Sequence, residues 1–184
     1  MAGSDRIQYH TTPETVSEEH RRHYDSIAES RGHISGPFAV LLNSPELAGR
    51  VGHLGAYVRF EGKLSDEDRE LAILTTARAF DCAYEWAAHA PIAREVGVRE
   101  DAIDVVADSL SVEDLQARER VIVEYGRELF ENHGVSDEAF EAALEAFGES
   151  GITELTGTMG YYAMLACVLN AFEVFPPEEW PKLP

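Results

Sequence analysis

Residues 70–89 read ELAILTTARAFDCAYEWAAH and hold most of the side chains of this chain that can carry chemistry. Cys82 follows Glu70 by twelve positions, and Glu85 and His89 follow Cys82 by three and seven. Neighbours on a helix surface lie three or four residues apart, so a helix over this part places Cys82, Glu85 and His89 on one face. The stretch therefore predicts a helical site with a thiol, two carboxylates and an imidazole.

Helical spacing and helix-start signals recur on both sides of this stretch. Ser44-Pro45-Glu46 offers a cap, a proline at the first helical position and an acid against the helix dipole. Ser65 and Ser111 each have an acid three residues on, which resembles a capping box. No stretch alternates polar and apolar residues as a strand does. The sequence predicts an all-α fold, a single domain of about eight helices.

The chain divides into three expected parts. Residues 1–34 are expected to form an N-terminal arm and a first helix, residues 35–174 the main domain, and residues 175–184 a proline-rich tail. Trp180 in this tail is expected to pack on another part of the protein, and a neighbouring subunit is one candidate. Towards the end of the main domain, helices are expected over 136–147 and 153–172.

The charge balance limits the class of partner. The chain has 34 acidic against 15 Lys and Arg residues, a net charge of −19. Such a surface repels nucleic acid and anionic membranes, so a small-molecule partner is expected instead. Only two of the bases are lysines, which leaves adaptation to high salt open as an explanation.

The cysteines and the apolar segments favour a cytoplasmic protein. Cys82 and Cys167 are too few and too far apart in sequence for a disulfide framework. Residues 1–6 contain no apolar signal region. Residues 155–172 carry no charge, but their Thr, Gly, Tyr and Asn side chains are too polar for a membrane span. We expect this run to be a helix buried on nearly every side, and a partner subunit is expected to help cover it.

The site residues have functional and structural interpretations. With Asp81 as the cap, Cys82 falls in the first helical turn, where the dipole favours a thiolate. The Glu85–His89 spacing can hold the imidazole in one tautomer, and Glu70 can reach it if the preceding helix is antiparallel. Equally, such Glu–His pairs are usually solvated, and a lone Cys is usually a core residue. Outside the stretch, His53 and Tyr57 are the added pocket candidates.

Metal and cofactor chemistry is not expected. The acids and the histidine at positions 70, 85 and 89 offer ligands, but no His-rich or paired-Glu pattern accompanies them. A Gly-rich phosphate loop and a dinucleotide fingerprint are also missing from the sequence. We therefore predict no metal and no cofactor.

The motifs resemble the carboxymuconolactone decarboxylase family, whose redox branch is the alkylhydroperoxidase AhpD. The resemblance spans about residues 35–173 and is carried by four stretches: Pro37–Leu47, Leu54–Phe60, Arg69–Leu74 and Cys82-x-Tyr84-Glu85-Trp86-x-x-His89 with Ala93 and Gly97. It implies an AhpD-like helical bundle that assembles as a homo-oligomer, either a trimer or a hexamer of two trimers. In the redox branch the residue corresponding to Glu85 is the second, peroxidatic cysteine.

The resemblance implies two activities. The first is a cofactor-independent lyase that performs acid–base chemistry on a small carboxylated or lactone-type compound. Here Glu70, Glu85 and His89 would form the acid–base group, Cys82 would line the site, and Tyr84 and Arg78 would bind substrate together with His53 and Tyr57. The second is a thiol peroxidase with peroxiredoxin activity that uses Cys82. A non-catalytic oligomeric protein is the third alternative.

Overall fold

The computed structural model describes residues 5–184, which contain eight α-helices and no strand. The all-α prediction is therefore confirmed. The first four residues of the expected N-terminal arm, and with them most of the segment expected to lack a signal, lie outside the described part of the chain. The described residues form two compact units, residues up to 62 with 167–178 and residues 63–166 with 179–184.

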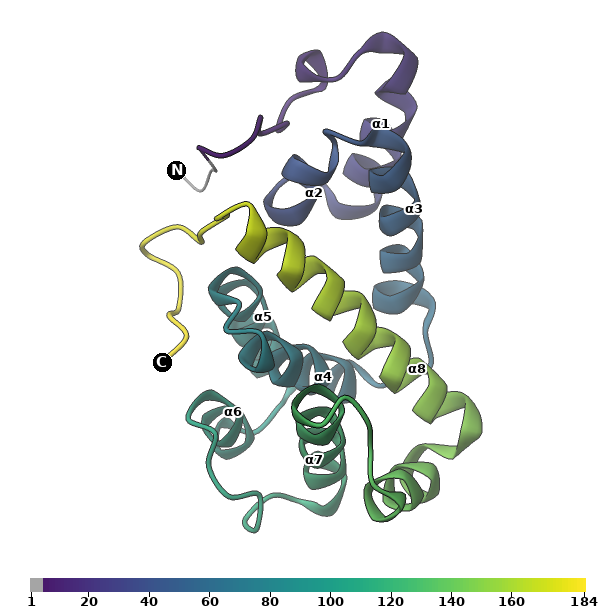
Figure 1. The fold of residues 1–184 in the computed structure, drawn as a ribbon, viewed down its shortest axis with the longest axis vertical. Helices are drawn as coiled ribbons and strands as arrows, with labels where there is room; N and C mark the ends of the chain where they lie inside the picture. Colours follow the sequence, from purple (N-terminus) through teal and green to yellow (C-terminus); the bar gives the residue numbers. More distant parts are fainter. Residues whose placement is uncertain (1–4) are drawn as a thin grey trace. The chain divides into compact units, whose positions relative to one another are not determined.

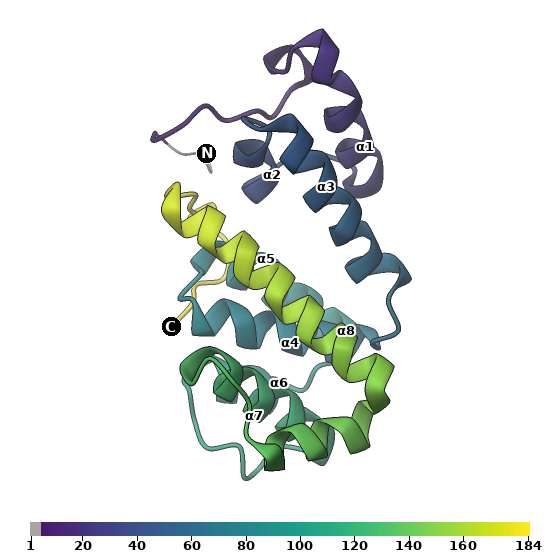
Figure 2. The same cartoon turned by 45° about the vertical axis from the view of Figure 1, so that its right-hand side comes forward.

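The first unit contains the short helices near the N-terminus. Two 3-10 turns, Pro13–Thr15 and Glu18–His20, precede α1 (Arg21–Arg31), α2 (Gly36–Leu41), α3 (Pro45–Ala56) and a π-helical turn, Tyr57–Glu61. Gly32 ends α1 in the left-handed conformation that glycine adopts without strain (φ 79°). Figure 2 shows α1 and α3 side by side, which agrees with their residue contacts. Arg6 is held to the end of α8 by a 2.9 Å bond to the Ala171 carbonyl.

The second unit is built around α4 (Asp66–Ala79), which packs against α5 (Ala83–Val96), α6 (Glu100–Ala107) and α7 (Ala117–Glu131). Figure 1 shows α4 to α7 gathered in one part of the molecule. Every residue of α4 from Glu70 to Ala77 is buried, which leaves no solvated face over that length. A helix that is covered on all sides must satisfy its polar side chains inside the protein. The hydroxyls of Thr75 and Thr76 do so by donating to the carbonyls of Leu71 and Ala72.

Helix α8 (Asp137–Ala171) consists of two helical pieces that meet at Gly148 (φ 68°, ψ 173°). This agrees with the two helices expected over 136–147 and 153–172. The second piece is only partly buried within this chain, and the expected cover by a partner subunit stays a prediction. Gly157, Gly160 and Cys167 are exposed within the chain, while Leu155, Met159 and Ala166 are buried. The missing charges therefore reflect one apolar face and one face of small or uncharged side chains.

Two helix starts differ from the expected positions. Ser111 does not open α7, because its hydroxyl accepts from the Glu113 amide two residues on. The helix begins at Ala117 with a capping box between Gln116 and Glu119. Asp81 does not cap α5, because its φ of +46° belongs to the left-handed region. Cys82 is the N-cap instead. None of the helices among residues 5–184 is both long enough and apolar enough for a membrane span.

Candidate functional site

Glu70 is the polar residue that the α4 core has to accommodate. It lies one turn after the start of α4 and its side chain is 0% exposed. Ser65 caps this start by accepting a hydrogen bond from the Asp68 amide. A buried carboxylate is costly unless it meets a cation or hydrogen-bond donors. The position of Glu70 therefore requires partners from elsewhere in the unit.

His89 on α5 is the principal partner of Glu70. The Nδ1 atom of His89 lies 2.6 Å from Oε2 of Glu70, and the imidazole is 5% exposed. With the carboxylate ionised, Nδ1 carries the proton and donates a hydrogen bond to Glu70. This contact fixes the orientation of the ring and leaves Nε2 for chemistry, as in triads where an acid orients a histidine. The structure thus brings together two residues nineteen positions apart.

Glu85 meets the other nitrogen of the same ring. Its Oε2 atom lies 3.4 Å from Nε2 of His89, one helical turn away, and its side chain is 6% exposed. His89 is therefore flanked by a buried carboxylate at each ring nitrogen. A proton between Nε2 and Glu85 can belong to either group, since both are bases within reach of it. Glu70, His89 and Glu85 form what we call the acid–base cluster.

Arg69 is a neighbour of the cluster that the sequence reasoning did not include. Its Nε atom lies 3.6 Å from Oε1 of Glu70, its Nη2 atom lies 2.8 Å from Asp66, and the side chain is 12% exposed. Among the described residues, neither Arg69 Nε nor Glu70 Oε1 has a hydrogen-bond partner. The guanidinium of Arg69 thus places a positive charge beside the Glu70 carboxylate. Only the adjacency of Arg69 to Glu70 in sequence could have suggested this contact.

Aromatic rings adjoin the α5 residues of the site. Tyr162 of α8 presents its ring edge-on to His89, with centroids 5.1 Å apart and an 86° angle between the planes. Tyr84 is buried, and its ring centroid is 5.7 Å from that of Trp180. Trp180 therefore packs on its own chain. The sequence alone left the partner of Trp180 open. It also gave no signal for Tyr162, which lies in the uncharged run 155–172.

Cys82 stands one residue before α5 and is 1% exposed. Its backbone amide donates to the Ala77 carbonyl, which closes the turn between α4 and α5. As the N-cap, it lies next to the free amides at the start of the helix. Cys167 is exposed and belongs to the first unit. No disulfide bond joins Cys82 and Cys167.

Arg78 is a predicted substrate-binding residue of the second unit that is not part of the acid–base cluster. Arg78 lines a pocket of about 220 Å³ with side chains that include Thr75, Asp81, Ser109 and Arg127. Its guanidinium is 3.3 Å from Asp81 and donates to the Pro184 carbonyl at 3.1 Å. Neither Glu70, Glu85 nor His89 lines this pocket.

His53 and Tyr57 belong to the first unit. His53 lies in the last turn of α3, Tyr57 opens the π-helical turn that follows, and both side chains are exposed. Each residue is therefore accessible within its own unit.

A family match covers the middle of the chain. Residues 45–128 match the model of the carboxymuconolactone decarboxylase family. This segment includes α3, α4, α5 and α6 and the whole acid–base cluster. No curated protein matches the chain.

Solved structures at low sequence identity share the fold. A putative antioxidant defence protein AhpD of unknown function from Agrobacterium tumefaciens is 23% identical, with a TM-score of 0.68 over 75% of this chain and 96% of that one. A peroxidase-related protein with an alkylhydroperoxidase AhpD core from Ralstonia eutropha JMP134 is 19% identical, with a TM-score of 0.76 over 96% and 95%. The debrominase Bmp8, solved with 2,3,4-tribromopyrrole, is 12% identical, with a TM-score of 0.75 over 96% and 95%. The chain therefore has the AhpD-like fold.

Proposed function

Because residues 45–128 match the model of the carboxymuconolactone decarboxylase family, we propose that the chain is a cofactor-independent lyase acting on a small carboxylated or lactone-type compound. The observation that carries this proposal is the buried imidazole of His89 between the carboxylates of Glu70 and Glu85, at 2.6 and 3.4 Å. Such an arrangement stores one proton that can be given and taken back. General acid–base chemistry needs such a proton store within hydrogen-bond reach of the substrate.

Each member of the cluster has a separate task in this proposal. Glu70 accepts a hydrogen bond from Nδ1–H and holds the ring of His89 in place, and Arg69 lies next to its Oε1 atom. His89 exchanges a proton with Glu85 through Nε2. Because all three side chains are buried, their charges interact more strongly than they would in water. The carboxylate that faces the substrate is Glu85, and Glu70 acts through His89.

The reaction step is a decarboxylation in which protons and electrons balance. The carbon–carbon bond to the substrate carboxylate breaks and releases carbon dioxide. The electron pair left behind enters a conjugated carbonyl of the substrate and gives an enolate. The proton shared by Glu85 and His89 moves to the enolate carbon, and water restores the proton to the cluster. No electron leaves the substrate, so the step needs no oxidant or reductant.

A thiol peroxidase that uses Cys82 is the second candidate. It is supported by the place of Cys82 at the N-cap of α5, where backbone amides favour a thiolate, and by the fold shared with AhpD-type proteins. One observation favours the lyase over it: the position one turn along is a glutamate in place of the second thiol of the redox branch.

The lyase proposal is tested by turnover of carboxylated lactones and related keto acids in deuterated water. We expect release of carbon dioxide and one deuterium at the carbon that lost it, read by NMR. Glu70→Gln, which removes the charge and keeps the size, and His89→Asn should each lower kcat/KM by about 100-fold or more. Full activity in both variants overturns the assigned roles.

Two controls separate the candidates. Glu95→Gln changes an exposed glutamate on the same helix and should leave turnover unchanged. Cys82→Ser should also retain turnover if Cys82 only lines the site. Peroxide treatment followed by a sulfenic-acid trap should leave Cys82 unlabelled. Peroxide consumption that is lost in Cys82→Ser would establish the peroxidase instead. A chain that does neither reaction supports the non-catalytic alternative.

A further inference from the structure

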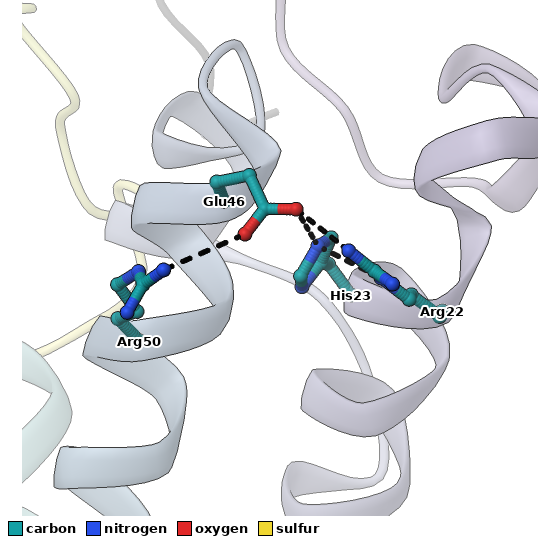
Figure 3. A network of polar contacts seen from close by, with 4 residues as sticks. All are labelled: Arg22, His23, Glu46 and Arg50. Carbon is teal, nitrogen blue, oxygen red and sulfur yellow. Dashed lines mark hydrogen bonds and ion pairs between the residues drawn. The ribbon is translucent and has the colours of Figure 1, made fainter.

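A second histidine–glutamate cluster lies in the first unit, on helices that carry no member of the acid–base cluster. His20, His23 and Glu46 each offer one ligand atom, and these atoms all lie within 4.8 Å of one another. Figure 3 shows His23 and Glu46 facing each other between α1 and α3, with Arg22 and Arg50 beside them. Glu46 lies in the first turn of α3, and the two helices pack together. We call these three donors the His–His–Glu cluster.

Local structure places the two histidines together. His20 ends the second 3-10 turn and precedes α1, and His23 stands in the first turn of α1. A separation of three residues brings two side chains to one side of a helical turn. Their ring centroids are 6.4 Å apart. Among the described residues, Nδ1 of His20 is buried and has no hydrogen-bond partner, so no protein group competes for it.

Gly49 on α3 determines how the ring of His23 lies. A Cβ atom at position 49 would stand 2.3 Å from Nδ1 of His23, so only glycine lets the ring rest against the α3 backbone. The side chain of His23 is 15% exposed as a result. With Nδ1 against the helix, Nε2 is the nitrogen that faces Glu46, at 3.0 Å from Oε1.

The contacts of His23 Nε2 conflict with one another. Nε2 lies 3.2 Å from the Nε donor of Arg22 and 3.0 Å from the carboxylate of Glu46. A neutral Nε2 without hydrogen accepts from Arg22 but then sets its lone pair against the carboxylate. A protonated Nε2 donates to Glu46 but then faces the N–H of Arg22. A cation held between Nε2 and Oε1 satisfies both acceptors at once.

We propose that His20, His23 and Glu46 bind a divalent transition-metal ion of the Zn²⁺ type. Two imidazoles and one carboxylate are the donor set of open zinc sites, which leave the fourth position to water. Ligand atoms about 2.1 Å from a tetrahedral ion lie about 3.4 Å from one another. The three donor atoms of the cluster lie within 4.8 Å of one another, so small rotations of their side chains bring them to this distance. The bound ion links the start of α1 to the start of α3.

Arg22 is the group that the ion displaces. Its Nη2 atom lies 2.7 Å from the same Oε1 of Glu46 that faces His23, and its side chain is 71% exposed. An ion pair this exposed is weak, so the guanidinium can move into solvent. Arg50 is more distant, at 3.9 Å from Oε2.

The test is Zn²⁺ binding to the metal-stripped protein, measured by titration calorimetry and by the visible spectrum of Co²⁺ in the same site. We expect one ion per chain. His20→Ala, His23→Ala and Glu46→Gln should each weaken binding by about 100-fold or more, since each removes one of three ligands. Arg22→Gln should tighten binding by about fivefold, because it removes the competing cation.

His33→Ala provides the matched control, because His33 is an exposed histidine of the same unit outside the cluster. It should bind Zn²⁺ as tightly as the unchanged protein. Absence of saturable binding overturns the proposal, and so does binding that survives in all three ligand variants. Circular dichroism of each variant confirms that the helices persist, so that lost binding reports the lost ligand.

Discussion

The acid–base cluster and the His–His–Glu cluster combine the same two residue types, Glu and His, in different surroundings. His89 lies between two glutamates with every side chain at most 6% exposed. Glu46 beside His23 is 52% exposed and is contacted by Arg22 and Arg50 as well. Removing one member of the first cluster costs much free energy, because a buried charge that loses its partner is not hydrated instead. The contacts of Glu46 with Arg22 and Arg50 in the second cluster can rearrange at little cost in free energy, because water replaces them.

The difference indicates which chemistry each cluster suits. A buried acid–base pair keeps its geometry and its proton without competition from water, as catalysis demands. An exposed donor set exchanges partners easily, so an incoming cation can replace Arg22 on Glu46. The same two residue types would thus serve as a proton store in the second unit and as an ion site in the first, if both proposals hold. The surroundings, more than the residue types, separate the two roles.

The largest expected effect is on stability, from removal of one glutamate in each cluster. Glu70→Ala leaves a cavity and removes the partner of His89 and Arg69, so it should lower the free energy of unfolding by about 3–5 kcal/mol. Glu46→Ala should leave the free energy of unfolding nearly unchanged, because Glu46 and the two arginines beside it are largely exposed. Urea unfolding followed by circular dichroism measures both. Equal effects in the two variants would remove the distinction between the clusters.

Glu85→Cys tests which of the two activities position 85 selects. The change introduces a thiol three residues after Cys82, the spacing of the redox branch that the sequence resembles. Lyase turnover should fall by about 100-fold, because the carboxylate at Nε2 of His89 is lost. On mild oxidation the variant should form a disulfide between Cys82 and the introduced thiol, seen as the loss of two thiols by mass spectrometry.

Glu85→Gln is the companion variant for this experiment. It removes the carboxylate without adding a thiol, so it should lose turnover and form no disulfide with Cys82. Undiminished turnover in both variants would show that Glu85 takes no part in the proton exchange.

The smallest expected effect is the pH dependence contributed by Glu46. Its pKa is lowered by the hydrogen bonds from His23 and then Arg22, so the folded state favours the ionised form. A lowered folded pKa contributes stability above the unfolded pKa, about 4.3 for glutamate, and loses it as the pH falls through the folded value. The difference in urea midpoint between the unchanged protein and Glu46→Gln should therefore be small at pH 7 and vanish at pH 2.5. A difference that grows in acid would contradict this sign.

Particular residues show how far the sequence could predict the site. The helix that carries Glu85 and His89 followed from spacing, and the helix that carries Glu70 followed from the cap at Ser65. Arg69 escaped prediction because its contact with Glu70 depends on a side-chain rotamer. The shift of the α5 cap from Asp81 to Cys82 also escaped, because the bond from Cys82 to the Ala77 carbonyl decides the turn.

The sequence by itself determined the helical class, the strong negative charge and the presence of a thiol, acids and a base within residues 70–89. These follow from local periodicity, capping residues and composition, which are properties of short segments. Only the tertiary structure decided that Glu70 is wholly buried and that His89 meets a carboxylate at each nitrogen. Burial depends on how α5, α6 and α7 cover α4, and such contacts join residues far apart in the chain. The same holds for His23 and Glu46, because the packing of α1 on α3, permitted by Gly49, brings them within 3.0 Å.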